Sequence, residues 1–301
     1  MTEGSGMSEI KLLVLIITYN RLALLKECIQ AVLGQTWNSF DILVIDNHST
    51  DGTWEYLQAL EGKDSISFLR LGQNTGGSGG FHIGIREALR RGYSHIWLMD
   101  DDTVPDSHAA ERLLSADRLL GKYGFLVSLP IWKDGSLCKM NLPLPGQFRR
   151  EKGRILQEGL LPVRKATFVS MLLKAEIVRE VGLPIKEFFI WGDDQEYTER
   201  ISKKYKCYLV LSSVVQHKTK NNLGSDISTD SPERIERYFY AYRNELYIAK
   251  RNGILSLGFY FVRAFYSLIK ILLFSKERKW TRVLWLFRGI ISGLTFKPEP
   301  K

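Results

Sequence analysis

The sequence has few cysteines, and their positions do not suggest a structural role. Only three occur in 301 residues, Cys28, Cys138 and Cys207, and no two of them form a Cys-x-x-Cys pair. This spacing supports neither a disulfide framework nor a zinc site, and it is typical of a reducing cytoplasm. The start of the chain also lacks a basic flank followed by a long apolar core, so we expect no signal peptide and a loose tail over residues 1–9.

Net charge is absent from most of the chain. Residues 1–249 hold 31 Lys and Arg against 31 Asp and Glu, whereas residues 250–301 hold 11 against 2. The whole excess of +9 therefore lies in the C-terminal tail, which is also rich in aromatic residues. Such a tail is too apolar for an arm that tracks phosphates, so we expect no nucleic-acid partner and instead one local anionic surface.

Apolar runs alternate with amphipathic segments in the first hundred residues. The runs predict strands at 12–17, 42–45, 67–71 and 96–99, and helices are predicted between them, at 22–33, from about 53, and from 76 to about 92. Strands and helices that alternate at this spacing indicate βαβ units. The sequence therefore predicts the α/β class, with a mostly parallel sheet flanked by helices and ligands outside the carboxyl ends of the strands.

The pattern changes after residue 100. We expect strands at 125–129, 167–173 and 207–211, helices at 174–181 and 191–205, and irregular chain over 130–165. Ser231 followed by Pro232 is a typical helix start, and an apolar helical face follows it. We therefore expect a catalytic domain at 10–225 and a C-terminal amphipathic helical appendage at 230–301.

Three consecutive aspartates, Asp100, Asp101 and Asp102, follow the predicted strand at 96–99. Their mutual repulsion costs free energy unless a cation lies among them. Oxygen ligands suit Mg²⁺ or Mn²⁺, which often also hold substrate phosphates. His217, after the strand at 207–211, could supply a third ligand or be structural. The alternative for the aspartates is a solvated turn that caps the next helix.

Two other segments at strand ends suit a nucleotide. Asp46, after the second strand, could accept the imide N–H of uracil, although Asp51 and its polar neighbours also favour a turn that caps the next helix. Residues 76–80 hold four glycines in five positions. Glycine allows the backbone to approach a ligand or to cradle an anion at a helix start, and a flexible linker is the alternative.

Asp193 and Asp194 open the helix predicted at 191–205. The N-terminus of a helix stabilises carboxylates, and the same position suits a general base that faces a polar pocket. Simple helix capping is the alternative. Trp191, just before the pair, could stack on a sugar or anchor the loop in the core.

In this order the segments resemble the inverting glycosyltransferases of family 2 with the Rossmann-like GT-A fold, over about residues 10–220. The resemblance is carried by Ile17-Thr18-Tyr19-Asn20-Arg21, Asp46-Asn47 with Ser49 and Asp51, the glycine segment, the Asp-x-Asp in the triplet, and Trp-Gly-Asp-Asp-Gln-Glu-Tyr. The glycine segment, Trp191 and His217 look most like the bacterial galactofuranosyltransferases, with rhamnosyltransferases as near neighbours.

The resemblance implies a metal-dependent transferase of a UDP-sugar and a role for each matching position. Catalysis is implied for Asp194 as base with Asp193 beside it, and binding of Mn²⁺ or Mg²⁺ for Asp100, Asp102 and His217. Many relatives carry Glu-Asp here, so the choice of base within the pair stays open. Arg243 and Asn244 match a motif of related transferases, and their role is also open. Binding of the nucleotide sugar is implied for Thr18, Asn20, Arg21, Asp46, Asn74, Gly76, Gly77, Gly79, Gly80, Asp100, Asp101 and Trp191.

The tail combines aromatic with basic residues. Residues 254–275 are apolar but interrupted by Arg263 and Lys270, and their longest uncharged stretch is far shorter than the roughly 20 residues that span a bilayer. Basic helices with Trp and Phe lie in the membrane interface. We therefore expect a cytoplasmic protein, peripheral on the inner face of the cell membrane, that acts on a lipid-linked saccharide in polysaccharide synthesis such as that of O-antigen. Helices that pack on the catalytic domain or form a dimer, and a non-catalytic membrane-binding scaffold, are the alternatives.

Overall fold

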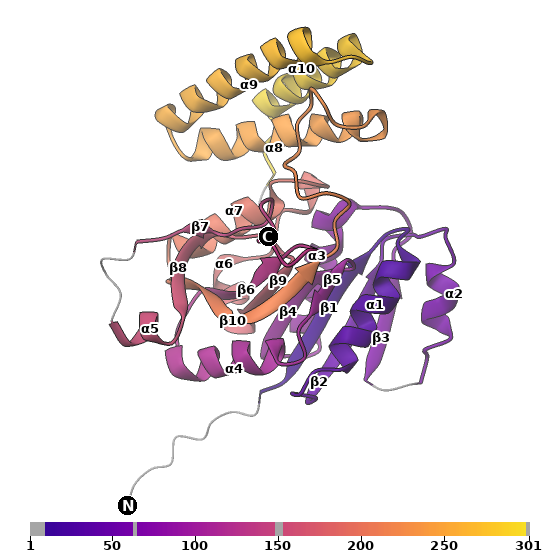
Figure 1. Cartoon of the computed structure of the whole chain (residues 1–301), viewed down its shortest axis with the longest axis vertical. Helices are drawn as coiled ribbons and strands as arrows, with labels where there is room; N and C mark the ends of the chain where they lie inside the picture. Colours follow the sequence, from indigo (N-terminus) through magenta and orange to yellow (C-terminus); the bar gives the residue numbers. More distant parts are fainter. Residues whose placement is uncertain (1–9, 63–64, 148–152, 299–301) are drawn as a thin grey trace, which may run out of the picture.

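The computed structural model describes residues 10–62, 65–147 and 153–298. The loose tail expected at 1–9 lies outside these residues. One mixed sheet with helices on its faces forms the body of the molecule, and a layer of three helices lies beyond one end of its strands (Figure 1). The predicted fold class is confirmed.

The first half of the sheet is parallel, as expected. Its strands are β1 (Leu12–Thr18), β2 (Phe40–Asp46), β3 (Ile66–Arg70) and β4 (His95–Asp100), in the order β3-β2-β1-β4. The helices between them are α1 (Leu22–Leu33), α2 (Thr53–Gln58) and α3 (Gly76–Arg90). Every residue of β1 is buried, and its side chains alternate between two apolar clusters. Its run is continuously apolar because both faces of the sheet are covered.

The second half of the sheet continues through an antiparallel strand. The strands are β5 (Thr103–Pro105), β6 (Phe125–Ile131), β7 (Leu144–Pro145), β8 (Leu160–Lys165), β9 (Ser170–Lys174) and β10 (Cys207–His217). The sheet order continues from β4 as β9-β6-β10-β8-β7, and β5 pairs with β10. Because β9 is antiparallel to both β4 and β6, β6 and β10 run in the same direction as β1 to β4.

Several local predictions are wrong in this half. The stretch 130–165, expected to be irregular, contains β7, α5 (Gly153–Gln157) and β8, and residues 148–152 within it are not described. The helix α4 (Ala109–Leu120) and the strand β5 were not expected. β10 continues six residues beyond the predicted end, through a shift of pairing register between Val210 and Val214. The other segments are α6 (Ala175–Val181), the 3₁₀ turn η2 (Lys186–Phe188) and α7 (Asp193–Ser202).

The C-terminal helices have a core of their own. A 3₁₀ turn, η3 (Pro232–Arg237), leads into α8 (Tyr238–Arg251), followed by α9 (Ile254–Phe274) and α10 (Lys279–Thr295). Ser231 is the N-cap residue of η3 and Pro232 begins it, as predicted, although the Ser231 side chain makes no capping bond and the first turn is 3₁₀. In α10, a Cβ at Gly289 would lie 2.7 Å from the carbonyl oxygen of Phe239. This glycine therefore allows α10 to pack closely on α8.

Candidate active site

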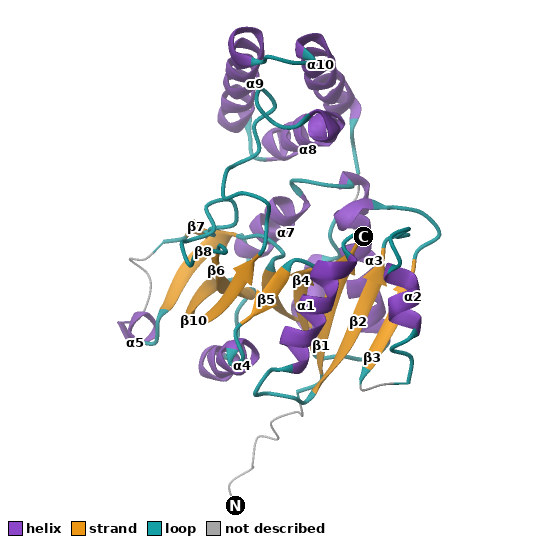
Figure 2. Ribbon diagram, turned by 45° about the vertical axis from the view of Figure 1, so that its right-hand side comes forward, coloured by secondary structure: helices purple, strands orange, loops and turns teal. Residues whose placement is uncertain are grey.

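Polar residues from distant segments meet at the end of the sheet that faces the helical layer. Thr18, Asp46, Asp100 and His217 are the last residues of β1, β2, β4 and β10. These strands run in one direction, so their carboxyl ends share one edge, below α7 and α8 in Figure 2. The sequence-based expectation placed ligands at this edge.

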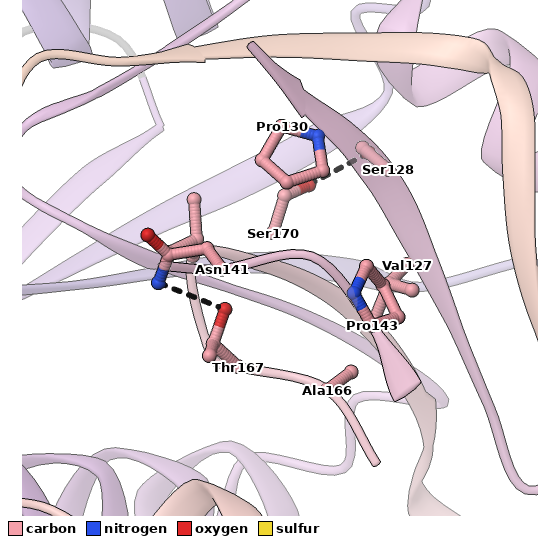
Figure 3. A pocket seen from close by; sticks show the side chains of 9 residues that line it. Val127, Ser128, Pro130, Asn141, Pro143, Ala166, Thr167 and Ser170 are labelled. Carbon is pink, nitrogen blue, oxygen red and sulfur yellow. Dashed lines mark hydrogen bonds between the residues drawn. The ribbon is translucent and has the colours of Figure 1, made fainter. Parts of the chain in front are cut away.

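Asp100, Asp102 and His217 form a group that can hold a metal ion. One ligand atom from each lies within 4.8 Å of the others, and His217 Nε2 is 2.9 Å from Asp102 Oδ1. On its other side, His217 Nδ1 is 2.9 Å from Asn141 Oδ1. Asn141 is itself held by Thr167, to which it donates from Nδ2 (Figure 3). Two carboxylates and one imidazole, oriented from behind by an amide, suit Mn²⁺ or Mg²⁺.

No pattern in the sequence singled out Asn141. It lies in the segment 130–165 that we expected to be irregular, 76 residues before the histidine it contacts. Because its amide oxygen only accepts hydrogen bonds, Nδ1 of His217 carries a proton, and Nε2 faces the carboxylates. Although burial opposes it, the hydrogen bond to Asp102 raises the pKa of His217 to about 10, so without a cation Nε2 is protonated as well. Asn141 thus keeps on Nδ1 the proton that a histidine bound to a metal through Nε2 retains.

Burial and mutual repulsion shape the charges of the group. Burial, together with Asp102, raises the pKa of Asp100 to about 7 against the pull of His217. Burial likewise raises the pKa of Asp101 to about 6, although Arg21 opposes it. Burial would raise the pKa of Asp102 too, but the hydrogen bond and charge of His217 outweigh it, and the pKa is lowered. A divalent cation at this position would stabilise all three ionised carboxylates.

Asp101 is not part of the group that can hold a metal ion, and it contacts residues at and just after the end of β1 instead. Its carboxylate accepts hydrogen bonds from Thr18 Oγ1 at 2.8 Å and from Arg21 Nη1 at 3.1 Å. Arg21 also reaches Asp102 at 2.8 Å. Thr18, Arg21 and Asp101, all implied to bind the nucleotide sugar, are thus brought together and join the end of β1 to the aspartate triplet.

Asp46, the last residue of β2, has one carboxylate oxygen that accepts no hydrogen bond from the described residues. Asp46 is fully buried, and its Oδ1 accepts the backbone N–H of Ser49 at 2.9 Å. Its Oδ2 forms an ion pair with Arg70, whose Nε lies 3.6 Å away, but accepts no hydrogen bond from the described residues. A buried carboxylate oxygen that accepts no hydrogen bond is costly. It therefore suits a donor brought by a ligand.

The turn between β2 and α2 is held by capping bonds. Asn20, at φ 51°, accepts the backbone N–H of Thr50 with its Oδ1 at 2.7 Å. Asp51 accepts the backbone N–H groups of Leu22 at 3.0 Å and Thr53 at 3.2 Å, which begin two helices. Asp51 thus satisfies the first backbone N–H group of each helix, as its predicted capping role requires. Asn20 lies against Ser49 and Thr50, and Ser49 in turn donates to Asp46.

The glycine segment forms the first turns of α3. Gly76 has φ +72°, and a Cβ there would lie 1.9 Å from the carbonyl oxygen of Phe189. The Asn74 side chain accepts the N–H of Gly76 at 2.8 Å, and Ser78 N–H donates to Phe189 at 3.2 Å. Glycine at position 76 therefore lets the start of α3 touch the loop that precedes α7.

The other three glycines of the segment have different surroundings. A Cβ at Gly79 would lie 2.4 Å from Thr75 Oγ1, and one at Gly80 would lie 2.6 Å from Ile17. Both are thus required for packing, the second against β1. Gly77 has no atom within 4 Å of a Cβ. Of the four, it is the one with open space beside its backbone.

Asp193 and Asp194 begin α7, and both have raised pKa values. Burial is the main cause for each, giving about 6 for Asp193 and about 8 for Asp194. The charges of Asp193 and Asp100 add to the shift of Asp194, so the metal-ligand group and this carboxylate lie close enough to interact. The side chain of Asp194 is partly accessible, whereas Asp193 is buried. A carboxylate with a pKa near neutrality and access to solvent can act as a general base.

Asn244 holds the loop before α7. Its Nδ2 lies 2.9 Å from the carbonyl oxygen of Phe188, 3.2 Å from that of Ile190 and 2.8 Å from that of Trp191. The neighbouring Arg243 donates to Phe188 as well, at 3.2 Å. The loop needs support because Trp191 has φ 63°, a backbone conformation that residues other than glycine rarely adopt. The motif at 243–244, whose role the sequence left open, thus fixes the loop that carries the aspartates.

Trp191 is half-buried between the two layers. Its ring centroid is 5.0 Å from that of Tyr238, and the guanidinium of Arg234 lies 5.6 Å from it. The residue is therefore anchored against η3 and α8.

The fold and these residues define a GT-A-like glycosyltransferase. The family model "Glycosyl transferase family 2" matches residues 13–182, more than half of the chain, and the chain belongs to this family.

The chain is also similar in sequence to individual relatives and in fold to solved structures. The chain is 27% identical, over 82% of its length and 88% of the relative, to galactofuranosyltransferase GlfT1 of Mycolicibacterium smegmatis. Its fold resembles GalNAc-T7 with UDP, GalNAc and Mn²⁺ (15% identity, TM-score 0.60, 80% of this chain and 51% of that one). It also resembles residues 1–349 of Staphylococcus aureus TarS with UDP-GlcNAc (12% identity, TM-score 0.55, 96% of this chain and 74% of that one). The chain is thus a galactofuranosyltransferase-like member of its family.

Proposed function

We propose that the protein transfers galactofuranose from UDP-galactofuranose to a saccharide acceptor with inversion at the anomeric carbon. The observation that carries the proposal is the group of Asp100, Asp102 and His217, which can hold a metal ion at one end of the sheet. Asp194, to whose raised pKa burial, Asp193 and the charge of Asp100 contribute, supplies a carboxylate near this group. The similarity to GlfT1 over most of both chains supports galactofuranose as the sugar.

The residues of the site fit this reaction. Asp194 accepts the proton of the acceptor hydroxyl while that oxygen forms its bond to the anomeric carbon. The bond between this carbon and the UDP oxygen breaks on the opposite side, and UDP leaves with the electron pair. Asp46 Oδ2 accepts the imide N–H of uracil and fixes the donor. Asp100, Asp102 and His217 would hold Mn²⁺ or Mg²⁺, which when bound neutralises charge on the diphosphate.

The C-terminal helices support a membrane-bound acceptor. The exposed apolar side chains of α9 include Leu255 and Phe259, which are 78% and 72% exposed, and Phe265 farther along. At the turn into α10, the exposed Phe274 and Trp280 stand beside Lys276, Arg278 and Lys279. An apolar face with basic and aromatic residues at its edge is typical of helices that lie in the interface of an anionic membrane. The acceptor is then a lipid-linked saccharide at the cytoplasmic face, used in the synthesis of a surface polysaccharide such as O-antigen.

An interfacial position explains α9 better than a transmembrane one. Among the described residues, α9 is the one helix long and apolar enough to cross a membrane. Its two charged residues, however, are paired with the rest of the protein, Arg263 with Glu245 and Lys270 with Asp226. Crossing the bilayer would draw these pairs into lipid or break them, and both outcomes are costly.

The donor assay tests the proposal directly. The purified protein is given UDP-galactofuranose or another nucleotide sugar, with Mn²⁺ or Mg²⁺ and a lipid-linked acceptor, and the release of UDP is measured. We expect release with UDP-galactofuranose, and none when the cation is removed by a chelator. Turnover of another donor alone, such as a nucleotide-linked rhamnose, would replace galactofuranose and favour a rhamnosyltransferase or another sugar transferase of the family.

Binding of UDP distinguishes the transferase from a membrane-binding scaffold. In a transferase of this kind, UDP raises the melting temperature only when Mn²⁺ or Mg²⁺ is present. A scaffold would show no stabilisation by UDP with or without the cation.

A further inference from the structure

The C-terminal helices enclose a pocket that the transfer chemistry does not use. It lies between α8, α9 and residues 225–227, and its volume is about 340 Å³. Small-molecule sites typically have about 300–1,000 Å³. The hollow beside Asn141 in Figure 3 offers only about 10 Å³, which is room for about one water molecule. Of these two cavities, only the one at α8 and α9 can hold a substrate.

Tyrosine rings form much of the wall of this pocket. Tyr238 and Tyr242 come from α8, and Tyr260 and Tyr266 from α9. The first three are buried, whereas Tyr266 is 62% exposed. A tyrosine ring offers an apolar face to the C–H groups of a sugar and a hydroxyl at its edge. The wall therefore suits a ligand that is apolar on its faces and polar around its rim.

The charged groups of the pocket are already paired. Arg263 pairs with Glu245 Oε2, and Lys270 pairs with Asp226 Oδ2. Two positive and two negative charges cancel, so the pocket has no net charge to attract a phosphate. The second oxygen of Glu245 has no hydrogen-bond partner in the described part of the chain, and Ser267 adds a hydroxyl to the lining. These groups favour neutral hydroxyls.

The position of the pocket links the active-site loop to the apolar surface. Tyr238 lines the pocket and packs on Trp191, two residues before Asp193. Tyr266, another lining residue, is next in sequence to Phe265, which is 64% exposed on α9. An amphiphile with its polar end in the pocket could thus lay its apolar chain on α9.

We propose that this pocket binds an uncharged saccharide unit of the acceptor, with the lipid part of the acceptor lying along α9. The identity of the ligand as the acceptor rests on the proposed function. The preference for a neutral sugar follows from the tyrosines and the paired charges.

Binding of alkyl glycosides to the full-length chain tests this proposal. The probes are octyl β-D-galactopyranoside and octyl β-D-glucopyranoside, studied by calorimetry below their micelle concentrations. Tetraethylene glycol monooctyl ether has the same chain without a sugar, and octyl phosphate carries an anion instead. We expect at least one glycoside to bind about tenfold more tightly than the ether or the phosphate.

Two substitutions place the binding in the pocket. Ser267→Trp fills it and should weaken glycoside binding about tenfold, while Ile269→Trp adds the same ring outside the lining on α9 and should leave it unchanged. Glu245→Gln, at a partly exposed side chain, is the second variant should Ser267→Trp fail to fold, and it should also weaken glycoside binding.

Three results would overturn the assignment. In the first, the glycosides bind no better than the ether. In the second, Ser267→Trp leaves glycoside binding unchanged, and in the third, octyl phosphate binds most tightly and its binding is lost in Ser267→Trp. Binding of UDP with Mn²⁺ to the same samples separates the two proposals. If UDP binds and the glycosides do not, only the saccharide pocket fails. If the glycosides bind as expected and UDP does not, the transferase and the identity of the sugar as an acceptor fail, and the neutral-sugar pocket stands.

Discussion

Asp193 and Asp194 are adjacent in the chain but have different surroundings. Asp193 is buried at the start of α7, whereas Asp194 is partly accessible and feels the charge of Asp100. A base must reach both the acceptor and the reacting carbon, so accessibility favours Asp194.

Asp194→Asn should abolish most of the transfer while UDP still binds. The substitution keeps the shape of the side chain but removes its ability to accept a proton, and a general base contributes about a hundredfold to ten-thousandfold. Turnover is measured by UDP release, and UDP affinity by calorimetry with Mn²⁺. The matched control is Asp134→Asn, which makes the same change at an exposed turn 60 residues before Asp194 and should keep full activity. Undiminished turnover in Asp194→Asn would remove this residue from the mechanism.

The raised pKa of Asp194 also predicts how stability depends on pH. In the folded protein without a cation this pKa is about 8, against an ordinary value of 3.8. The folded state therefore keeps a proton that the unfolded state releases, and stability falls as pH rises from about 4 to about 8. Asn cannot ionise, so Asp194→Asn should melt above the wild type at pH 8, by at least about 2 °C. The difference should vanish near pH 4.

Melting curves recorded with a chelator at several pH values test this. The other acids with raised pKa values are present in both proteins, so their effects largely cancel in the difference. Melting temperatures that differ by a constant amount at every pH would mean that the Asp194 carboxyl does not gain its proton on folding.

Among the elements, α8 joins the catalytic sheet to the outer helices. Its Asn244 holds three carbonyl groups of the loop before α7, and the ring of Tyr240 stacks on Phe189 at 4.6 Å. Phe189 in turn touches Gly76 at the start of α3. One helix thus sets the distance between the aspartates of α7 and the glycine segment.

Asn244→Ala should lower turnover without weakening UDP binding to the same degree. Loss of the amide leaves buried carbonyl groups without donors and loosens the strained loop, and a misplacement of about 1 Å can cost about a hundredfold in rate. We expect turnover to fall by about tenfold to a hundredfold. The control is Asn252→Ala, at the C-cap of α8. This amide donates to Glu199 and not to the loop before α7, so its loss should leave turnover nearly unchanged. If the two variants have equal turnover, Asn244 does not hold the loop in the position that catalysis needs.

The elements also show what the sequence could predict. The bounds of α1 match the expected helix, and β1, β2 and β4 lie where apolar runs stand between clear turns, because local pattern and burial agree there. β7 and β8 were missed because they are short antiparallel strands with distant partners. β8 pairs with residues 44 to 50 positions away, such as Leu209 opposite Leu161, and β7 pairs with β8 at 18 to 21 positions. Asn141 and Asn244 were not assigned roles for a similar reason, since their partners lie 76 and 53 to 56 residues away.

At the scale of the whole molecule, one end of the sheet lies beneath a helical layer (Figure 1). Many apolar side chains of α9 and α10 in this layer are exposed. Removal of residues 254–301 would be a poor test of this surface, because α10 packs on α8 through Gly289 and Gly293. Since α8 holds the catalytic loop, the deletion would disturb both parts. Substitutions of exposed side chains avoid this problem.

Phe259→Glu combined with Phe265→Glu should release the protein from anionic liposomes. These side chains are 72% and 64% exposed on α9, so their loss costs the fold little. Burial of each ring in the interface is worth about 1.5–3 kcal/mol, and a carboxylate is in addition repelled by anionic lipid. The bound fraction is measured by sedimentation with phosphatidylglycerol vesicles. Leu223→Glu, at a 68% exposed residue before η3, adds a carboxylate outside α9 and should leave sedimentation close to that of the wild type. If the double variant sediments as the wild type does, α9 is not the membrane-binding surface, and its apolar face must then meet a protein partner or a second copy of the chain.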